Sequence, residues 1–265
     1  MSDPLYEELR VLAELAARIG GATLMHWRDK FEARPKGVDD LVTNADVASQ
    51  QAIARLFKQQ RPDDLFVGEE QAEVAFPPTG SADICWVVDP LDGTVNYVHG
   101  FPFFATSVGA VQDQRVVAGA IFDPLRGELF SASLGGGATL NGRAIGSSSA
   151  SDLSEATVAI SLPPSVGDNA PDLKDFIQAA RLCRAVRRTG SAALNLAYVG
   201  AGRLDAHWAH EIKPWDAAAG VLVAAEGGAS VTACNGEPYD VWQAHYLVAS
   251  TPSLHAQLAE RLYKG

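Results

Sequence analysis

Residues 84–94 constrain the fold more than any other part of the chain. The apolar run at 84–88 has the length and composition of a buried strand, and we expect this strand to end at Asp89. Pro90 then enforces a turn, after which the chain resumes at Asp92. The pattern predicts two carboxylates close together at the mouth of a sheet, with a backbone carbonyl between them.

This turn interleaves groups that bind cations with groups that bind anions. Asp89, Asp92 and the Leu91 carbonyl offer the oxygen ligands that hard divalent cations such as Mg²⁺ prefer. Gly93 permits a ligand to approach the backbone closely, and a helix that begins near Thr94 would present free N–H groups to a phosphate. An isolated Asp-Pro-x-Asp is more often a capped surface turn, but the interleaving favours a metal-assisted phosphate site.

Two other acidic positions give weaker signals. Gly68-Glu69-Glu70 follows a short apolar strand at 65–67, although paired glutamates are usually a solvated charge run. Asp216 follows Trp215 at the start of an apolar helical stretch, where the helix dipole also favours an acid. Their joint presence with the central turn favours one shared site.

The charge balance limits the partners of the chain. Its 21 Lys and Arg residues against 32 Asp and Glu residues give a net charge of −11. Such a surface repels polyanions, so we expect no direct nucleic-acid binding and no binding to anionic membranes. A small phosphorylated substrate would be repelled too, unless bound cations reverse the local sign. The sequence also lacks a G-x-S-x-G elbow, a Walker loop and a dinucleotide-binding glycine motif, which disfavours serine hydrolases, NTPases and Rossmann proteins.

Thiol content and hydropathy predict a cytoplasmic protein. The cysteines are odd in number, isolated and without a C-x-x-C pair, as is typical of a reducing compartment: Cys85, Cys183 and Cys234. The N-terminal segment lacks the features of a signal peptide, and its leucines fall at the spacing of an amphipathic helix: Leu5, Leu9, Leu12, Leu15 and Ile19. The longest apolar stretch is far below the ~20 residues that span a bilayer.

The predicted elements change character near residue 150. The first half should hold helices at 4–30 and 43–60, a mobile polar loop at 34–40, and an antiparallel meander built from 103–111, 116–122 and 128–132. The second half should alternate strands at 157–160, 185–187, 204–208 and 246–249 with helices at 173–181, 191–199, 217–226 and 253–263. With 265 residues, we expect a single domain, 1–265, with structural halves at roughly 1–150 and 151–265.

Taken together, these motifs resemble the inositol monophosphatase family, within the lithium-sensitive phosphatases that include fructose-1,6-bisphosphatases. The resemblance covers almost the whole chain and rests on residues 36, 41–46, 68–70, 89–102, 190–193 and 215–220. The Asn-Tyr-Val-His-Gly-Phe-Pro continuation at 96–102 looks more like the inositol monophosphatase branch than the nucleotidase branch. The resemblance implies an α/β (α+β) fold, a layered α/β/α/β/α sandwich.

The resemblance also implies a ligand set for Mg²⁺. Glu69, Asp89 and the Leu91 carbonyl would hold one ion, and Asp89, Asp92 and Asp216 would hold a second, with Asp89 as the bridge. A third, weaker ion near Glu69 is a family feature. The expected cofactor is therefore two or three Mg²⁺ ions.

Roles for the remaining site residues follow from the same resemblance. Glu69 and Thr94 would orient the attacking water, with Thr43 and Asp46 in support, and these four form the expected catalytic group. The substrate-binding group would comprise Asp92, Gly93, Thr94, Ser191, Ala192 and Asp216, with the phosphate on the backbone N–H groups of the glycine and threonine. Lys36 would lie near the entrance.

One position departs from the family pattern. Inositol-specific members carry a glutamate seven residues before the Trp-Asp aspartate, where it contacts substrate hydroxyls, and Ala209 stands there in this chain. His210 and Glu211 are alternative sources of that contact or ordinary surface residues. The family's other substrate-side serine has no obvious match near Pro163 and Pro164, although Ser161 and Ser165 are close in sequence.

The leading hypothesis is a Mg²⁺-dependent phosphomonoesterase that acts on a small phosphorylated polyol, with inositol-1-phosphate first among the substrates. Because Ala209 replaces the glutamate of inositol-specific members, an alternative is the same chemistry on another substrate: histidinol phosphate, fructose-1,6-bisphosphate or a nucleotide 3′-phosphate. An alternative of another class is a regulatory binding protein of this fold, associated with transcription machinery. The resemblance further implies a homodimer and inhibition by lithium.

Overall fold

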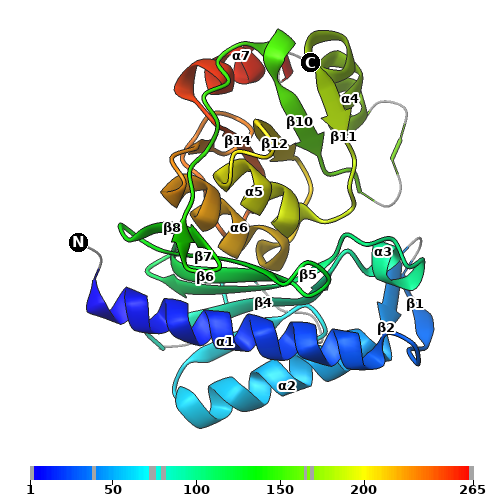
Figure 1. Ribbon diagram of the computed structural model, residues 1–265, viewed down its shortest axis with the longest axis vertical. Coiled ribbons are helices and arrows are strands. Elements are labelled where there is room, and N and C mark those ends of the chain that lie inside the picture. Colours follow the sequence, from blue (N-terminus) through cyan, green and yellow to red (C-terminus); the bar gives the residue numbers. More distant parts are fainter. Residues whose placement is uncertain are drawn as a thin grey trace.

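The computed structural model describes residues 3–37, 40–71, 76–78, 82–163, 166–167 and 170–262. The described elements stack in alternating layers (Figure 1). Helices α1 (Pro4–Trp27) and α2 (Asn44–Gln60) cover the outer face of one sheet, helices α5 (Ala192–Gly200) and α6 (Pro214–Glu226) lie between the two sheets, and helices α4 (Pro171–Leu182) and α7 (Pro252–Leu262) cover the second sheet. This is the predicted α/β/α/β/α sandwich.

The first sheet carries the predicted meander. Its seven strands follow sequence order: β3 (Leu65–Gly68), β4 (Cys85–Asp92), β5 (Ala105–Gln112), β6 (Arg115–Asp123), β7 (Glu128–Ser133), β8 (Gly137–Leu140) and β9 (Arg143–Ala144). Strand β3 runs parallel to β4, and every later neighbour is antiparallel. Short hairpin connections account for this arrangement, since only antiparallel neighbours can be joined by tight turns.

The second sheet has five strands and mixed directions. Its order is β11 (Ala185–Arg187), β10 (Thr157–Ile160), β12 (Ala206–Ala209), β14 (Tyr246–Ala249) and β13 (Ser230–Thr232). Strand β10 is parallel to β11 and β12, whereas β14 is antiparallel to β12 and β13. The two remaining helices are short: η1 (Leu153–Glu155) and α3 (Thr94–Val98).

Helices α5 and α6 are apolar on nearly every side because they are sandwiched between two sheets. Helix α6 lies very close to the first sheet, where Gly119 faces Ala219. A Cβ atom on Gly119 would lie 2.9 Å from the Cα atom of Ala219. The apolar cluster at this contact contains residues from both halves of the chain, for example Val87 and Ala193.

The buried face of α1 includes Leu9 of the leucine stripe, with Leu5 and Leu12 partly buried beside it, but not Leu15. Small residues make up most of the face toward the sheet, and the buried set is Leu9, Ala13, Ala16, Ala17, Gly20, Gly21 and Leu24. Leu15 is 47% exposed. The close approach of the helix explains the difference, because a Cβ atom on Gly21 would lie 2.5 Å from the ring of Phe122. The predicted helix is confirmed, but its orientation follows small-residue packing rather than leucine spacing.

The predicted mobile loop at 34–40 is also corrected. Its described residues lie in a two-stranded sheet of β1 (Ala33–Gly37) and β2 (Asp40–Thr43), with Arg34 paired to Val42. Pro35 is tolerated because a two-stranded ribbon consists only of edge strands. No described helix is long and apolar enough to cross a membrane.

Candidate active site

Strand β4 continues through the acidic turn instead of ending at Asp89. Asp89 pairs with Ser107 of β5, the register then shifts, and Asp92 pairs with Ala105. The Pro90 carbonyl in this irregular stretch accepts hydrogen bonds of 3.1 Å from the hydroxyls of Ser49 and Thr106. A bulge of this kind re-aims side chains at a sheet edge. It points both carboxyl groups toward the region between the two sheets.

Four acidic side chains from three segments meet at this bulge. Glu69 lies in the turn after β3, with its amide 3.1 Å from the Val88 carbonyl, and Asp216 lies in the first turn of α6. Burial raises the pKa of Asp89 well above its usual range, and the charges of Glu69, Asp92 and Asp216 raise it further. The structure therefore brings together all four predicted carboxylates.

Asp89 and Asp216 form a hydrogen-bonded pair of carboxyl groups. Burial, followed by the charges of Glu69 and Asp92, raises the pKa of Asp216. Its Oδ2 atom accepts the Lys213 amide at 3.0 Å, and its carboxyl group is hydrogen-bonded to that of Asp89. A carboxylate can accept from a carboxyl group only if that group keeps its proton. Asp89 and Asp216 therefore share one proton, which belongs to the pair rather than to either residue.

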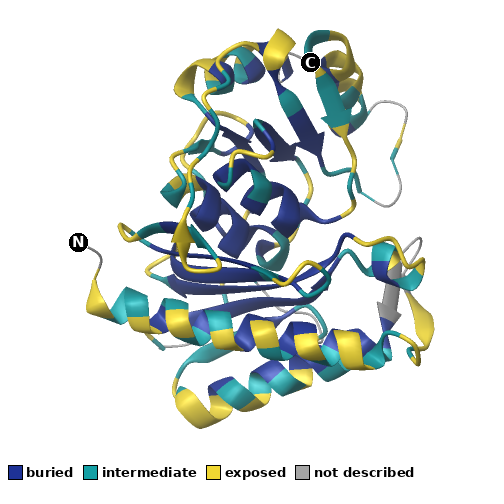
Figure 2. Cartoon of the chain, viewed as in Figure 1, coloured by how far each residue is buried: buried dark blue, intermediate teal, exposed yellow. Residues whose placement is uncertain are grey.

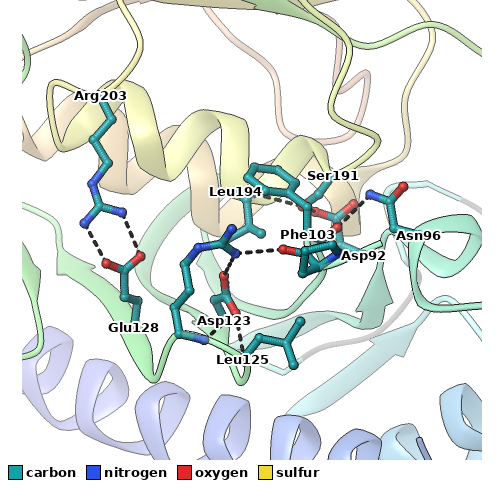
Figure 3. Close-up of polar contacts among 11 residues, drawn as sticks. Asp92, Asn96, Phe103, Asp123, Leu125, Glu128, Ser191, Leu194 and Arg203 are labelled. Atoms are coloured by element: carbon teal, nitrogen blue, oxygen red, sulfur yellow. Dashed lines mark hydrogen bonds and ion pairs between the residues drawn. The ribbon is translucent and has the colours of Figure 1, made fainter. Parts of the chain in front are cut away.

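Asp92 is attached to the N-terminus of α5 (Figure 3). Its carboxylate accepts hydrogen bonds from the Ser191 hydroxyl and from the amides of Ala192 at 3.2 Å and Ala193 at 2.8 Å. Ser191 also caps the helix, because its Oγ atom accepts the Leu194 amide at 3.3 Å. Burial raises the pKa of Asp92, while these hydrogen bonds oppose that shift.

A second polar group supports the threonine of the turn. Thr43 and Asp46 form a capping box at the start of α2, in which the Thr43 amide donates to Asp46 Oδ2 at 3.0 Å. The Thr94 hydroxyl lies 3.3 Å from Asp46 Oδ1 and 3.1 Å from the Leu91 carbonyl oxygen, so it donates to one of them. Burial raises the pKa of Asp46 to about 7, although the Thr43 hydroxyl lowers it in part.

Gly93 and α3 form the turn for which the sequence predicts anion binding. Gly93 has a φ of 97°, and a Cβ atom there would lie 3.0 Å from the Phe103 carbonyl oxygen, so glycine is required. Helix α3 begins at Thr94, as predicted. Its first backbone N–H groups have no partner within the helix, and they follow Asp92 and Gly93 directly in the chain.

Sequence reasoning missed two side chains that fix this geometry. The amide nitrogen of Asn96 donates to the carbonyls of Phe103 at 2.7 Å and Thr189 at 2.8 Å, which attaches α3 to the segment before α5 (Figure 3). Gln50 on α2 accepts the Glu70 amide at 2.8 Å. The position of Asn96 directly after the acidic glycine turn is the signal that could have identified it. Nothing in the local sequence identifies Gln50.

The side chains of Ala209 and His210 offer no acceptor atom for a substrate hydroxyl. Ala209 is fully buried in β12 opposite Tyr246. The His210 imidazole lies 2.8 Å from Asp175 on α4. Burial lowers the pKa of His210, but hydrogen bonds to Asp175 and Cys234 outweigh it and raise the pKa to about 10. Protonated His210 has no acceptor atom for a substrate hydroxyl. Glu211 is exposed.

Other predicted positions are only partly placed. Ser191 and Ala192 are buried beside Asp92. Lys36 lies in β1, with its side chain outside the described residues, and Ser165 also falls outside them. The Ser161 hydroxyl lies 3.4 Å from His207 Nε2.

The donor chemistry of the site suits a hard cation. The predicted ligands are carboxylate groups and one backbone carbonyl oxygen. Mutual repulsion among the carboxylates favours a bound positive charge. Within the described ranges, no group of three or more Asp, Glu, His or Cys side chains has the geometry of a formed ion site. Asp89 is instead hydrogen-bonded to Asp216, and Asp92 is hydrogen-bonded to the N-terminus of α5. Ion binding would thus displace the shared proton and reorient these oxygens.

The chain is similar to known proteins over nearly its whole length. A family model described as "Inositol monophosphatase family" matches residues 5–264. The inositol-1-monophosphatase of Caulobacter vibrioides is 36% identical over 239 residues, 88% of this chain and 91% of that protein. The Nus factor SuhB of Vibrio cholerae is 36% identical over 245 residues, 91% and 90% of the two chains. The crystal structure of the extragenic suppressor protein suhB from Bartonella henselae aligns with a TM-score of 0.89 and 32% identity, covering 97% of this chain and 99% of that one.

Proposed function

Because the chain belongs to the inositol monophosphatase family, we propose that this phosphatase is Mg²⁺-dependent and hydrolyses a small phosphorylated polyol, with inositol-1-phosphate as the leading substrate. The observation that carries the proposal is the meeting of Glu69, Asp89, Asp92 and Asp216 beside the anion-binding turn. Enzymes of this family are generally metal-dependent. A cation site next to a phosphate site suits metal-assisted hydrolysis of a phosphate ester.

The proposed ligands follow the chemistry of the donors. Glu69, Asp89 and the Leu91 carbonyl would hold one Mg²⁺, and Asp89, Asp92 and Asp216 a second, with a third weaker ion near Glu69. Bound Mg²⁺ supplies positive charge for the phosphate oxygens and lowers the pKa of a bound water. The hydrogen bonds that Ser191 and α5 make to Asp92 help to keep its carboxylate ionised for this role.

The residues of the turn would bind the phosphate and direct the water. The backbone N–H groups of Gly93 and Thr94 provide donors for phosphate oxygens. When the Thr94 hydroxyl donates to Asp46, its oxygen can accept a hydrogen bond from the attacking water, which Glu69 would orient from the other side. Thr43 holds Asp46 in place for this contact.

Substrate choice is the finer part of the proposal. Ser191 and Ala192 would border the leaving group, whereas Ala209 offers no acceptor for a polyol hydroxyl. Loss of that acceptor favours the alternatives of histidinol phosphate, fructose-1,6-bisphosphate and a nucleotide 3′-phosphate over a strict requirement for inositol. A homodimer, a cytoplasmic location and lithium inhibition remain part of the same proposal.

Phosphate release from a panel of these phosphomonoesters tests the proposal. We expect turnover that requires Mg²⁺ and vanishes with a chelator. Asp92→Asn removes a charged ligand but nearly preserves shape, so turnover should fall roughly a thousandfold. The matched control is Asp113→Asn in the exposed β5–β6 turn, which should behave like the parent. Near-normal turnover of Asp92→Asn would contradict the two-ion assignment.

The similarity to a protein named Nus factor SuhB favours a second candidate function. This candidate is a regulatory protein of the same fold that associates with transcription machinery. The same panel separates the two candidates. An absence of phosphate release from every phosphomonoester, in a folded protein supplied with Mg²⁺, would favour the regulatory function.

A further inference from the structure

The layer between the second sheet and the helices α5 and α6 contains a fully buried tyrosine, Tyr246 of β14. The strands and helices of this layer are mostly dark blue in Figure 2, and the Tyr246 side chain is out of reach of bulk water. Its hydroxyl group has no hydrogen-bond partner among the residues that the structure describes. A buried hydroxyl without a partner costs free energy, which a phenylalanine at this position would avoid. We therefore expect the hydroxyl group to find its partner in another state of the protein.

The strand register directs the Tyr246 side chain toward the helices between the two sheets. Tyr246 pairs with Ala209 of β12, and both side chains belong to an apolar cluster that also contains Ala217 and Val221 of α6. The small side chain of Ala209 leaves room for the tyrosine ring on this face of the sheet. Ala217 directly follows Asp216 in the chain. The tyrosine ring therefore packs in the same cluster as the first turn of α6, which carries one of the proposed metal ligands.

The charges of the site act on this hydroxyl group. Burial raises the pKa of Tyr246 well above its usual range, and Tyr239, Asp216 and Asp92 raise it further. Because such effects fall off with distance, the hydroxyl group lies near the carboxylates of α6 and of the acidic turn. The Tyr239 ring lies 6.5 Å from the Tyr246 ring, and its hydroxyl group also lacks a partner within the described ranges. Asp216 thus has phenol groups nearby that lack an acceptor in the metal-free protein.

Asp216 becomes a better acceptor when it loses its share of the proton. A carboxylate has about four acceptor positions, of which the Lys213 amide occupies one at 3.0 Å. The shared proton links the group to Asp89 in the metal-free protein. If an ion replaces this proton, Asp216 is fully ionised and gains an acceptor position beside a layer that excludes water. A phenol hydroxyl suits this position, because it keeps its proton at neutral pH and donates one hydrogen bond.

We propose that Tyr246 is a positioning residue for Asp216, and that its hydroxyl donates to the Asp216 carboxylate once an ion has replaced the shared proton. The inference rests on the proposed role of Asp216 as a ligand of Mg²⁺. Hydrogen bonds to a ligating carboxylate orient it and raise the affinity for the metal. The Tyr246 hydroxyl then stabilises the ion-bound protein, although it destabilises the metal-free one. A tyrosine with a purely structural role would stabilise both states alike.

Tyr246→Phe removes only the hydroxyl group and so distinguishes the two roles. In chelator, its midpoint of thermal unfolding should equal or exceed that of the parent, because an unpaired buried group is lost. Titration with Mg²⁺, followed by the rise of this midpoint, should give a dissociation constant about tenfold above that of the parent. Tyr97→Phe is the matched control in chelator. The Tyr97 hydroxyl donates to the Leu24 carbonyl at 2.7 Å, so the midpoint of this variant should fall by roughly 2–4 °C.

Two results would overturn the role of Tyr246. One is a dissociation constant for Mg²⁺ that is the same in Tyr246→Phe and the parent. The other is a midpoint in chelator that falls as far in Tyr246→Phe as in Tyr97→Phe, which would show that the hydroxyl group already has a partner in the metal-free protein. Both results leave the proposed function intact while the parent binds Mg²⁺ and hydrolyses a phosphomonoester. A parent that binds no Mg²⁺ would contradict the proposed function, and the role of Tyr246 with it.

Discussion

At the scale of single residues, the site depends on side chains that hold other side chains. Asp92 is kept in place by Ser191 and two amides of α5, and Thr94 by Asp46. None of these contacts can be read from spacing, because Asp92 and Ser191 are 99 residues apart in sequence. Substitutions of the supporting residues should therefore affect activity without removing any proposed metal ligand.

Ser191→Ala should reduce both stability and turnover. The substitution removes one donor to Asp92 and the N-cap of α5, a loss of about 1–2 kcal/mol in the free energy of unfolding. Ser191→Thr keeps the hydroxyl and serves as the matched control. Thermal unfolding and kcat/KM for the best substrate measure the two effects. Equal behaviour of the alanine and threonine variants would show that the hydroxyl has no such role.

Asn96→Ala should weaken substrate binding through the phosphate turn. The change leaves the carbonyls of Phe103 and Thr189 without the amide that joins them, so α3 loses its attachment to the segment before α5. We expect kcat/KM to fall by about 10- to 100-fold. Asn235→Ala, on an exposed turn, is the control. If steady-state kinetics of Asn96→Ala match those of Asn235→Ala, the attachment is not needed for catalysis.

At the scale of elements, α5 and α6 pack on the first sheet and so join the second half of the chain to it. Helix α5 is fixed at its start by Asp92, and the Arg203 guanidinium beyond its end forms two hydrogen bonds of 2.7 and 2.6 Å to Glu128 on β7 (Figure 3). Helix α6 packs through Ala219 against Gly119, and its first turn presents Asp216. The position of Asp216 thus depends on a helix–sheet contact one helical turn along α6.

Gly119→Ala tests that dependence. The added methyl group would lie 2.9 Å from the Cα atom of Ala219, so α6 must shift outward. We expect a loss of about 1–3 kcal/mol in stability together with a lower kcat, because Asp216 moves with the helix. Gly146→Ala is the control, since its Cβ atom would meet only a backbone oxygen at 3.8 Å. A stable Gly119→Ala protein with unchanged kcat would separate the helix contact from the site.

The same elements show what a sequence can and cannot predict. The strand before Asp89 and the helix from Thr94 were predictable because apolar runs and glycine turns are local signals. The outward turn of Leu15 was not, because it follows from how closely Gly21 approaches Phe122 across the fold. The β1–β2 hairpin was missed because its Pro and Gly residues have the composition of a loop. Local patterns thus predict elements, whereas contacts between distant elements decide which face is buried.

At the scale of the whole molecule, four acids meet between the two sheets of a chain whose net charge is already −11. Burial and mutual repulsion raise the pKa values of Asp89 and Asp216, and burial raises that of Asp46 to about 7. In the unfolded chain these groups ionise near pH 4. The metal-free folded protein therefore binds protons that the unfolded chain releases.

This difference predicts opposite effects of pH with and without Mg²⁺. Without Mg²⁺, stability should fall as pH rises from about 6.5 to about 8.5, by up to about 1.4 kcal/mol per pH unit for each group that is protonated only in the folded state. His210, with a pKa raised to about 10, acts in the same direction, whereas His207, with a pKa lowered by burial to about 4, acts only below this range. Excess Mg²⁺ binds the ionised carboxylates, so its stabilising effect should grow as pH rises. Thermal unfolding in Mg²⁺ and in chelator over this range measures both trends, and Asp216→Asn should weaken both. A Mg²⁺ effect that is independent of pH would contradict the shared proton between Asp89 and Asp216.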